Sequence, residues 1–467
     1  MKFKNTLLLF AAFLVVLAVV LVFEHKGNRD KAAKEKAEKL VDLASEDVEK
    51  ITLKTGAGAL SFKKDEDGDW MIQEPIQTRA DGSEVRSLAE SFSSLRIERV
   101  VESEAKDPAA YEIPKTEVSL WTKGREEPVT VLIGMENPLD GTLFAKRADA
   151  GRVVLLASYL KTTIDKKLFD FREKAVFKYA TADVKGVRLR AKDIRWEASR
   201  KEDRWFLTKP VQSLAAQSKI ESLLDALSNL KAKEFISEEK KGEEIRRLGL
   251  DKAEYEVVLS MPLANQETVF SIHKAGDRTY AASSSMNKLV AVDDLILSDL
   301  AKKPEDLREK KVAGFSSWEA DRVLVRKGAL SLAAVKEKVQ DEDKWRLETP
   351  AGEAADGSKI EAFLRKIEVL EAASFVDPPF NPADFGMAPP EAEVEIRVKE
   401  SGKEAREVSL FIGKEDPEKK QIVIKNPSLD YLFRVDAAFL DDFPKELKDW
   451  KAEEKTESAA DKAEEKK

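Results

Sequence analysis

Few residue types in this chain could carry out covalent or acid–base chemistry. Among 467 residues there is no cysteine, and the two histidines are His25 and His273. Disulfides, thiolate nucleophiles, cysteine-based metal centres and histidine-rich metal clusters are therefore excluded. Carboxylates, lysine, tyrosine and serine remain, but acidic pairs such as Glu393 and Glu395 are too common in this chain to mark a catalytic dyad. No P-loop, dinucleotide-binding, nucleophile-elbow or metalloprotease motif occurs. We predict no catalytic, cofactor-binding or metal-binding residue, and no cofactor.

Tryptophans are the next candidates, because an aromatic ring can bind a sugar or a peptide. Trp70, Trp205 and Trp345 recur at offsets of 135 and 140 residues within apolar strand patterns, which favours core packing. The other four do not repeat, and they are the better candidates for ligand contact: Trp121, Trp196, Trp318 and Trp450.

Several polar features have simpler explanations than a site. His273 occupies the position of Gly134 and Gly413 in the other copies, so we interpret it as a turn position that permits an unusual backbone conformation. The Arg-Glu-Lys clusters at 172–174 and 308–310 could contact a partner, but we expect them to pair across adjoining domains or to face water. The GAGAL run at 56–60 is typical of a hairpin.

These residues are positioned by a unit that occurs three times. WMIQEP (70–75), WFLTKP (205–210) and WRLETP (345–350) are each followed by a polar turn and an amphipathic pattern. We predict helices N-capped by Ser83, Ser218 and Ser358, with Glu221 and Glu361 completing capping boxes. One apolar helical face recurs at the same offsets: Val85, Leu88, Ala89, Phe92 and Leu95; Ile220, Leu223, Leu224, Leu227 and Leu230; Ile360, Phe363, Leu364, Ile367 and Leu370.

Alternating strand patterns surround each helix, with three strands before it and four or five after it. Consecutive short strands joined by turns favour antiparallel sheets and the α+β class. We predict three tandem domains at 48–180, 181–317 and 318–450, each with one amphipathic helix and a short closing helix.

An apolar segment of 18 residues, 6–23, follows the flank 1–5 and predicts an uncleaved transmembrane anchor. Its orientation is ambiguous, because two lysines precede it and six basic residues follow it. Long domains translocate largely regardless of such charges, so we favour a periplasmic location on the bacterial inner membrane. Residues 24–47 read as a charged stalk, and 451–467 as a disordered charged tail.

The net charge of -8 comes from interspersed charges of both signs, without a basic stripe, which argues against nucleic acid as a partner. The anchor, the repeated W-x-[LI]-x-x-P strands, the polar turn before an amphipathic helix and the [LF]-I-G strand together resemble a bacterial family of unknown function. Members of that family are typically encoded beside ABC exporter components of the gliding-motility type. The resemblance implies no catalytic residues.

We therefore expect a non-enzymatic, membrane-anchored envelope protein that binds or scaffolds protein partners, with an ABC-type permease as one candidate partner. One alternative is a cell-wall or polysaccharide-binding module that uses the non-repeating tryptophans. Another is a carboxylate-based hydrolase whose acids converge only in three dimensions.

Overall fold

The computed structural model describes residues 37–453 except 262–265, 340–341 and 352. It contains three antiparallel sheets in tandem with few helices, which confirms the predicted α+β class and the triplication. The chain divides between Lys174 and Ala175 into two compact units; the first holds the first sheet and the second holds the other two. The predicted anchor at 6–23 lies outside the described residues. Within the described part, no helix is both long enough and apolar enough to cross a bilayer.

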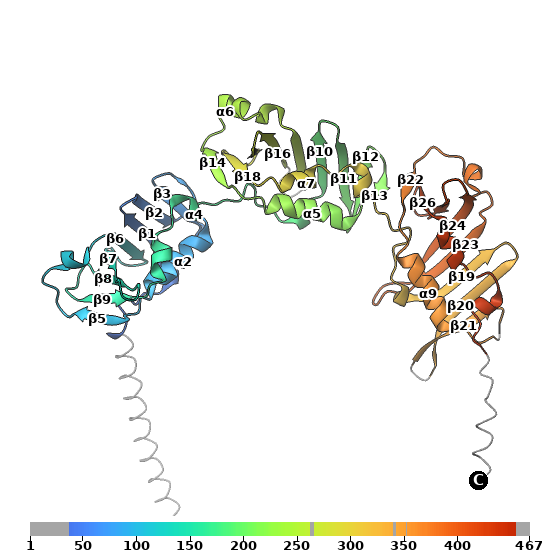
Figure 1. Ribbon diagram of the computed structural model, residues 1–467, viewed down its shortest axis with the longest axis horizontal. Coiled ribbons are helices and arrows are strands. Elements are labelled where there is room, and N and C mark those ends of the chain that lie inside the picture. The colour runs from blue at the N-terminus through green and yellow to red at the C-terminus, as the bar shows by residue number, and fades with distance from the viewer. Residues whose placement is uncertain (1–36, 262–265, 340–341, 352, 454–467) are drawn as a thin grey trace, which may run out of the picture. The chain divides into compact units, whose positions relative to one another are not determined.

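The first repeat has the strand order β4-β3-β2-β1-β6-β7-β8-β9-β5. Helix α2 (Gly82–Ser93) lies across one face of this sheet (Figure 1) and buries Val85, Leu88 and Phe92 against it. Two short helices, α3 (Leu160–Ile164) and α4 (Leu168–Phe171), close the repeat. The strands are β1 (Val48–Thr55), β2 (Gly58–Lys64), β3 (Trp70–Glu74), β4 (Thr78–Arg79), β5 (Arg99–Glu102), β6 (Thr116–Thr122), β7 (Val129–Glu136), β8 (Leu143–Arg147) and β9 (Val153–Leu156).

The second repeat has the same topology, with order β13-β12-β11-β10-β15-β16-β17-β18-β14. It adds helix α6 (Gly242–Arg247), under which a small separate apolar cluster forms around Leu248 and Leu250. Its main and closing helices are α5 (Gln217–Ser228), α7 (Ile296–Leu300) and α8 (Pro304–Leu307). Its strands are β10 (Gly186–Ala191), β11 (Arg195–Lys201), β12 (Arg204–Lys209), β13 (Ser213–Leu214), β14 (Glu234–Ser237), β15 (Tyr255–Met261), β16 (Gln266–Ala275), β17 (Arg278–Ser283) and β18 (Leu289–Val292).

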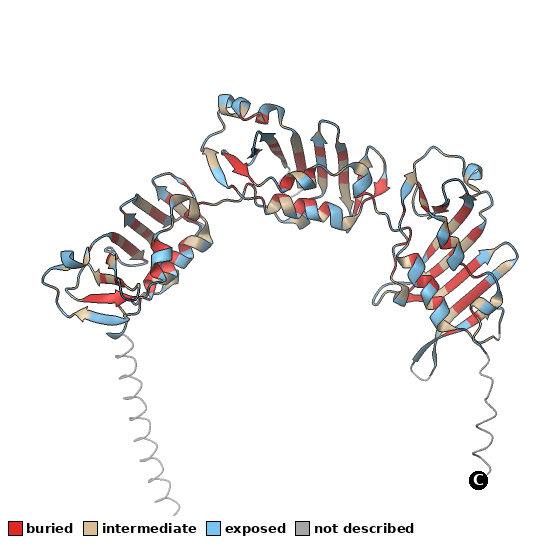
Figure 2. Ribbon diagram, viewed as in Figure 1, coloured by how far each residue is buried: buried red, intermediate tan, exposed pale blue. Residues whose placement is uncertain are grey.

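The third repeat has the order β21-β20-β19-β23-β24-β25-β26-β22. Its main helix is α9 (Gly357–Glu368), and 3₁₀ turns replace the closing helices. Along many strands of the three sheets, buried residues alternate with half-buried or exposed ones (Figure 2), as expected for sheets with one face on a core. Its strands are β19 (Ala320–Lys327), β20 (Leu330–Val339), β21 (Glu342–Thr349), β22 (Ser374–Val376), β23 (Ala392–Val398), β24 (Arg406–Asp416), β25 (Gln421–Lys425) and β26 (Leu432–Asp436).

The predicted serine caps are wrong. Helix α2 begins at Gly82, so Asp81 is the N-cap, and its carboxylate accepts from the amides of Ser83 (3.0 Å) and Glu84 (3.3 Å). Asp356 caps α9 in the same way. In the second repeat the N-cap is Ala216, which offers no side-chain acceptor. Each serine is therefore the second residue of its helix, and the capping boxes predicted for Glu221 and Glu361 do not form.

Each repeat begins earlier than predicted. Leu40 and Val41, within the predicted stalk, are 3% and 1% exposed and belong to the first core. The amide of Leu40 donates to Leu95 O (2.8 Å), just after α2, and Val176 and Val312 make the corresponding bonds to Leu230 and Leu370. An extended segment thus enters each repeat before its first long strand, so the domains start ahead of 48, 181 and 318.

The closing segments also repeat. Phe171, Leu307 and Trp450 are buried in the three cores. Their backbone carbonyls accept hydrogen bonds from the amides of the N-cap residues of the three main helices. The next residues, Arg172, Arg308 and Lys451, each form a bridge with an alanine: Ala80, Ala215 and Ala355. The predicted disordered tail therefore contains two ordered residues at its start, since Ala452 also donates to Ala354.

Candidate functional site

A cleft in the first repeat lies between the β1–β2 turn and the connection from α3 to α4. Its volume is about 700 Å³, within the range of about 300–1,000 Å³ that is usual for small-molecule sites. Leu60, Leu143, Ile164 and Leu168 provide its apolar surface, together with Pro75. Gly56 and Ala57 form the two-residue turn between β1 and β2 at one side, which confirms the predicted hairpin.

Residues at three positions of this cleft are smaller than their equivalents in the second repeat. The strand registers align Gly58, Leu60 and Gly134 with Ile194, Trp196 and His273. Trp196 is fully buried and Ile194 packs against the second core, whereas Leu60 is half-buried at the cleft. The first repeat therefore leaves open a space into which the second repeat places the side chains of Ile194 and Trp196.

The third repeat is intermediate. By strand register, Leu330 and Leu332 are the equivalents of Gly58 and Leu60, and Gly413 is the equivalent of Gly134. Leu332 is 1% exposed and Leu330 packs against its core. The combination of two small residues and a leucine at these positions belongs to the first repeat.

Gly134 is required by a close backbone approach, which corrects the interpretation of His273 as a turn residue. A Cβ on Gly134 would lie 2.0 Å from the carbonyl oxygen of Tyr111, and one on Gly413 equally close to that of Phe385. Both glycines lie inside strands at a register shift. His273 also lies inside a strand, opposite Tyr280, and its ring occupies space that Gly249 leaves free by lacking a Cβ.

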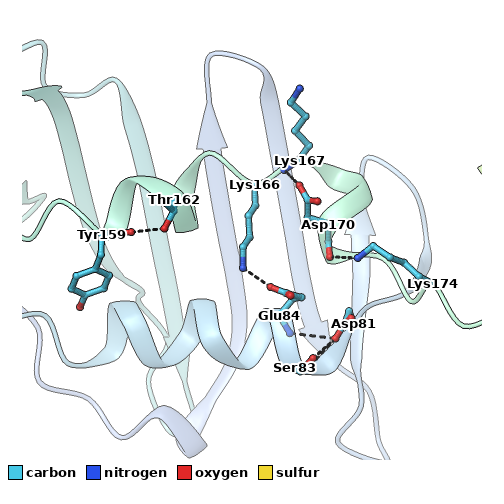
Figure 3. A network of polar contacts seen from close by, with 9 residues as sticks. All are labelled: Asp81, Ser83, Glu84, Tyr159, Thr162, Lys166, Lys167, Asp170 and Lys174. Atoms are coloured by element: carbon cyan, nitrogen blue, oxygen red, sulfur yellow. Dashed lines mark hydrogen bonds and ion pairs between the residues drawn. The ribbon is translucent and has the colours of Figure 1, made fainter. Parts of the chain in front are cut away.

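Four lysines line the cleft: Lys115, Lys161, Lys166 and Lys167. Lys115 pairs with Glu112 (2.9 Å), and Lys166 reaches Glu84 on α2. Figure 3 shows Lys166 and Lys167 pointing in opposite directions, with Lys167 extending away from α2. Among the described residues the Lys167 ammonium has no ion-pair partner, while its backbone amide donates to Asp170 (2.8 Å).

Two carboxylates, Glu136 and Asp165, also line the cleft. Glu136 is ion-paired with Lys161, and this hydrogen bond raises the pKa of the Lys161 ammonium above its ordinary value. The cleft thus combines an apolar floor with a rim that carries more positive than negative groups. In the part of the chain that the structure describes, no three potential metal-ligating side chains come together.

A second feature joins the second and third repeats. Arg308 is 4% exposed, and its guanidinium makes a bidentate bond to Asp377 of the third repeat (2.9 and 2.8 Å). The Arg308 Nε donates to the Ser213 hydroxyl (3.1 Å) in the second repeat, and the guanidinium carbon Cζ lies 3.7 Å from the ring centroid of Phe375. The expectation that this Arg-Glu-Lys cluster pairs across adjoining domains is confirmed for Arg308. Arg172 is buried at the corresponding place in the first repeat.

The tryptophans separate into buried and exposed groups. Trp70, Trp205 and Trp345 are 3%, 1% and 7% exposed, which confirms their core role. Trp196 and Trp450 are also core residues. Trp121 is half-buried under Lys50, whose Nζ lies 4.6 Å from the ring centroid, and Trp318 is 73% exposed. Of the four proposed ligand contacts, Trp318 alone presents most of its ring to solvent.

The sequence contained a signal for the cleft that motif searches missed. GAGAL matches no binding motif, but aligning the three hairpins by register shows Gly58 where the other copies carry Ile194 and Leu330, and Leu60 where the second copy carries Trp196. A loss of volume at core-facing positions in one copy of a repeat is the relevant signal.

Taken together, these features define a tandem-repeat protein of three antiparallel sheet domains with a small-molecule-sized cleft in the first. The chain belongs to the family described as "Domain of unknown function (DUF4340)", which it matches at residues 26–111, 70–241, 205–383 and 345–465. Three of these four overlapping matches begin at the repeated tryptophans, so the family pattern follows the repeat.

No curated protein matches the chain. Two solved structures from Pseudomonas aeruginosa align along most of its length. One is a DNA polymerase sliding clamp with ligand (8% identity, 85% of this chain and 93% of that chain, TM-score 0.15), and the other is the DNA polymerase III subunit beta (9%, 84% and 92%, TM-score 0.15). At these TM-scores the likeness supports no conclusion on fold or function.

Proposed function

We propose that this protein is a non-enzymatic, membrane-anchored binding component of the bacterial cell envelope, accessory to an ABC-type export complex. The cleft of the first repeat carries this proposal, because it is an open, apolar-floored space whose counterpart in the second repeat holds larger side chains. Binding sites commonly have this character, and a chain that repeats one domain can specialise one copy while the others keep their structural role.

Several observations support a binding role. Glu136 in the cleft is already paired with Lys161. The buried Arg308 guanidinium makes hydrogen bonds to Ser213 of the second repeat and to Asp377 of the third. The apolar segment 6–23 and the genomic context typical of the resembling family motivate the membrane and exporter parts of the proposal.

The test is crosslinking in native membranes. The full chain with a C-terminal affinity tag is treated with an amine-reactive crosslinker, purified and analysed by mass spectrometry. An unrelated single-pass protein with the same tag and expression level is the control. We expect an ABC permease or ATPase enriched over the control; recovery of no transporter or envelope protein above it would refute the proposal.

A glycan-binding module is the second candidate, favoured by the exposure of Trp318 (73%). It predicts that the full chain pellets with peptidoglycan and that Trp318→Ala reduces the pelleted fraction, whereas Trp121→Ala does not. Absence of pelleting by the wild-type chain removes this candidate.

A further inference from the structure

The cleft of the first repeat has the properties of a site for one class of small molecule. We infer that it binds an amphiphile with an apolar chain and a single anionic head group, a carboxylate or a phosphate. This inference rests on the proposed binding function and names its ligand class.

The apolar part of the ligand follows from the floor. Leu143 and Ile164 are 3% and 7% exposed, and Leu60 and Leu168 pack partly against the same core. Leu143 and Ile164 have little surface left to bury, so an apolar chain placed here would mainly remove the exposed parts of Leu60 and Leu168 from water, with a gain of roughly 25 cal/mol for each Å² buried. A wholly polar ligand would leave that surface without a favourable contact.

The anionic part follows from the rim. Four lysines and two carboxylates line the cleft. Lys161 is matched inside the cleft by Glu136 and also interacts with the second carboxylate, Asp165, whereas Lys115 and Lys166 are matched by Glu112 and Glu84 outside its lining. Lys167 is the remaining cation, and its side chain extends away from α2 (Figure 3). One ammonium without an ion-pair partner among the described residues suits one anionic group.

The position of Lys167 is set by the fold. Its backbone amide donates to Asp170 at the start of α4, as the amide of Lys303 donates to Asp306 (3.1 Å) at the start of α8. Lys303 is therefore its structural counterpart in the second repeat, where Trp196 and Ile194 occupy the corresponding space. Lys303 is therefore an internal control for Lys167, because it occupies the equivalent position beside a cleft that side chains fill.

The experiment is calorimetric titration of the full chain in phosphatidylcholine nanodiscs with octanoate, octanol and acetate, each corrected with empty nanodiscs. We expect octanoate to bind about 2- to 5-fold more tightly than octanol, the range for one exposed ion pair, and acetate to show no binding. Leu60→Trp, which introduces the residue of the second repeat, should weaken octanoate binding more than tenfold. Lys167→Gln should reduce it to the affinity of octanol, and Lys303→Gln should leave it unchanged.

Circular dichroism melting of each variant separates loss of binding from loss of folding. If Leu60→Trp does not fold, Ala59→Phe is the second variant that narrows the cleft. Failure of octanoate to bind the wild-type chain, binding unaffected by a folded cleft-filling variant, or equal effects of Lys167→Gln and Lys303→Gln would each overturn the inference. Partner crosslinking does not depend on octanoate, so the proposed function can stand if this inference fails.

Discussion

The Arg308–Asp377 pair should control how firmly the third repeat is joined to the second. Asp377→Asn keeps the shape of the side chain but removes its charge. Arg308 would then be a buried cation, 4% exposed, without its counter-ion. The exposed pair between Arg326 and Glu395 (2.7 Å) provides the matched control variant, Glu395→Gln.

The expected magnitude follows from burial. Removing one partner of a fully buried pair costs about 3–5 kcal/mol. The Asp377 side chain is 35% exposed, so water compensates part of the loss. We therefore expect a cost of about 2 kcal/mol, within the range of about 1.5–3 kcal/mol for hydrogen bonds to charged groups. Glu395→Gln should cost less than about 1 kcal/mol, because both partners are substantially exposed.

Hydrogen exchange is the appropriate assay, because a chain with several domains does not unfold in one step. The amides of Val312 and Ala372 link the entering segment to the end of α9, through bonds to Leu370 (3.1 Å) and Lys310 (2.8 Å). A loss of about 2 kcal/mol should accelerate their exchange about 30-fold in Asp377→Asn. The amides of β6 in the first repeat should be unaffected.

Equal acceleration in Asp377→Asn and Glu395→Gln, or no acceleration in either, would refute the view that Arg308 fastens these repeats. The double variant Arg308→Met with Asp377→Leu gives a further check. If unpaired charge is the cause, this variant should recover most of the lost protection, since replacing a buried pair by apolar residues is often neutral.

Three further predictions concern the cap, the cleft wall and the tryptophans. Asp81→Ala should destabilise the first repeat by about 1 kcal/mol at pH 7. Burial alone would raise the pKa of Asp81, but hydrogen bonds from Ser83 and Glu84 and the charge of Lys174 lower it overall. The stabilisation by this cap is therefore present above the unfolded-state pKa and is lost as the pH falls through the folded-state pKa. Thermal melts from pH 7 to 2 measure this loss. Gly134→Ala should cost about 1–3 kcal/mol by overpacking, measured by urea denaturation. Trp196→Ala should cost about 3–5 kcal/mol, whereas Trp318→Ala should change stability by less than about 0.5 kcal/mol in the same assay.

Each of these has an outcome that contradicts it. A penalty for Asp81→Ala that persists at pH 2 would mean that the carboxylate does not act as a charged cap. A neutral Gly134→Ala would show that the Tyr111 carbonyl can move away without cost. A large loss in Trp318→Ala would place that ring in a core.

Local patterns in the sequence determined the repeated unit. The 3.6-residue periodicity identified the buried faces of α2, α5 and α9, and alternation identified most long strands, because both patterns record which side of an element avoids water. Cap identity was not predicted correctly. From the sequence alone, α2 could begin at Gly82 or at a later residue. The start at Gly82 depends on a hydrogen bond from the amide of Asp81 to the carbonyl of Phe171, which is distant in sequence.

The starts of the repeats depended on contacts between distant residues. Residues 37–47 read as a charged linker, yet Leu40 and Val41 pair with and pack beside the segment after α2. Two apolar residues carry little signal among many charges. These two residues are buried because backbone groups in the segment after α2, such as the carbonyl of Leu95, need hydrogen-bond partners. Local composition does not show where such partners are needed.

The sequence by itself determined that catalysis through cysteine or histidine clusters is excluded and that one α+β domain occurs three times. Only the tertiary structure brought the β1–β2 turn beside the α3–α4 connection and aligned Gly58 and Leu60 with Ile194 and Trp196 of the second repeat. Residue types and periodicity are local properties of the chain. A cleft is the volume left unfilled where segments about 100 residues apart meet, and strand register decides which side chains of the strands face that volume.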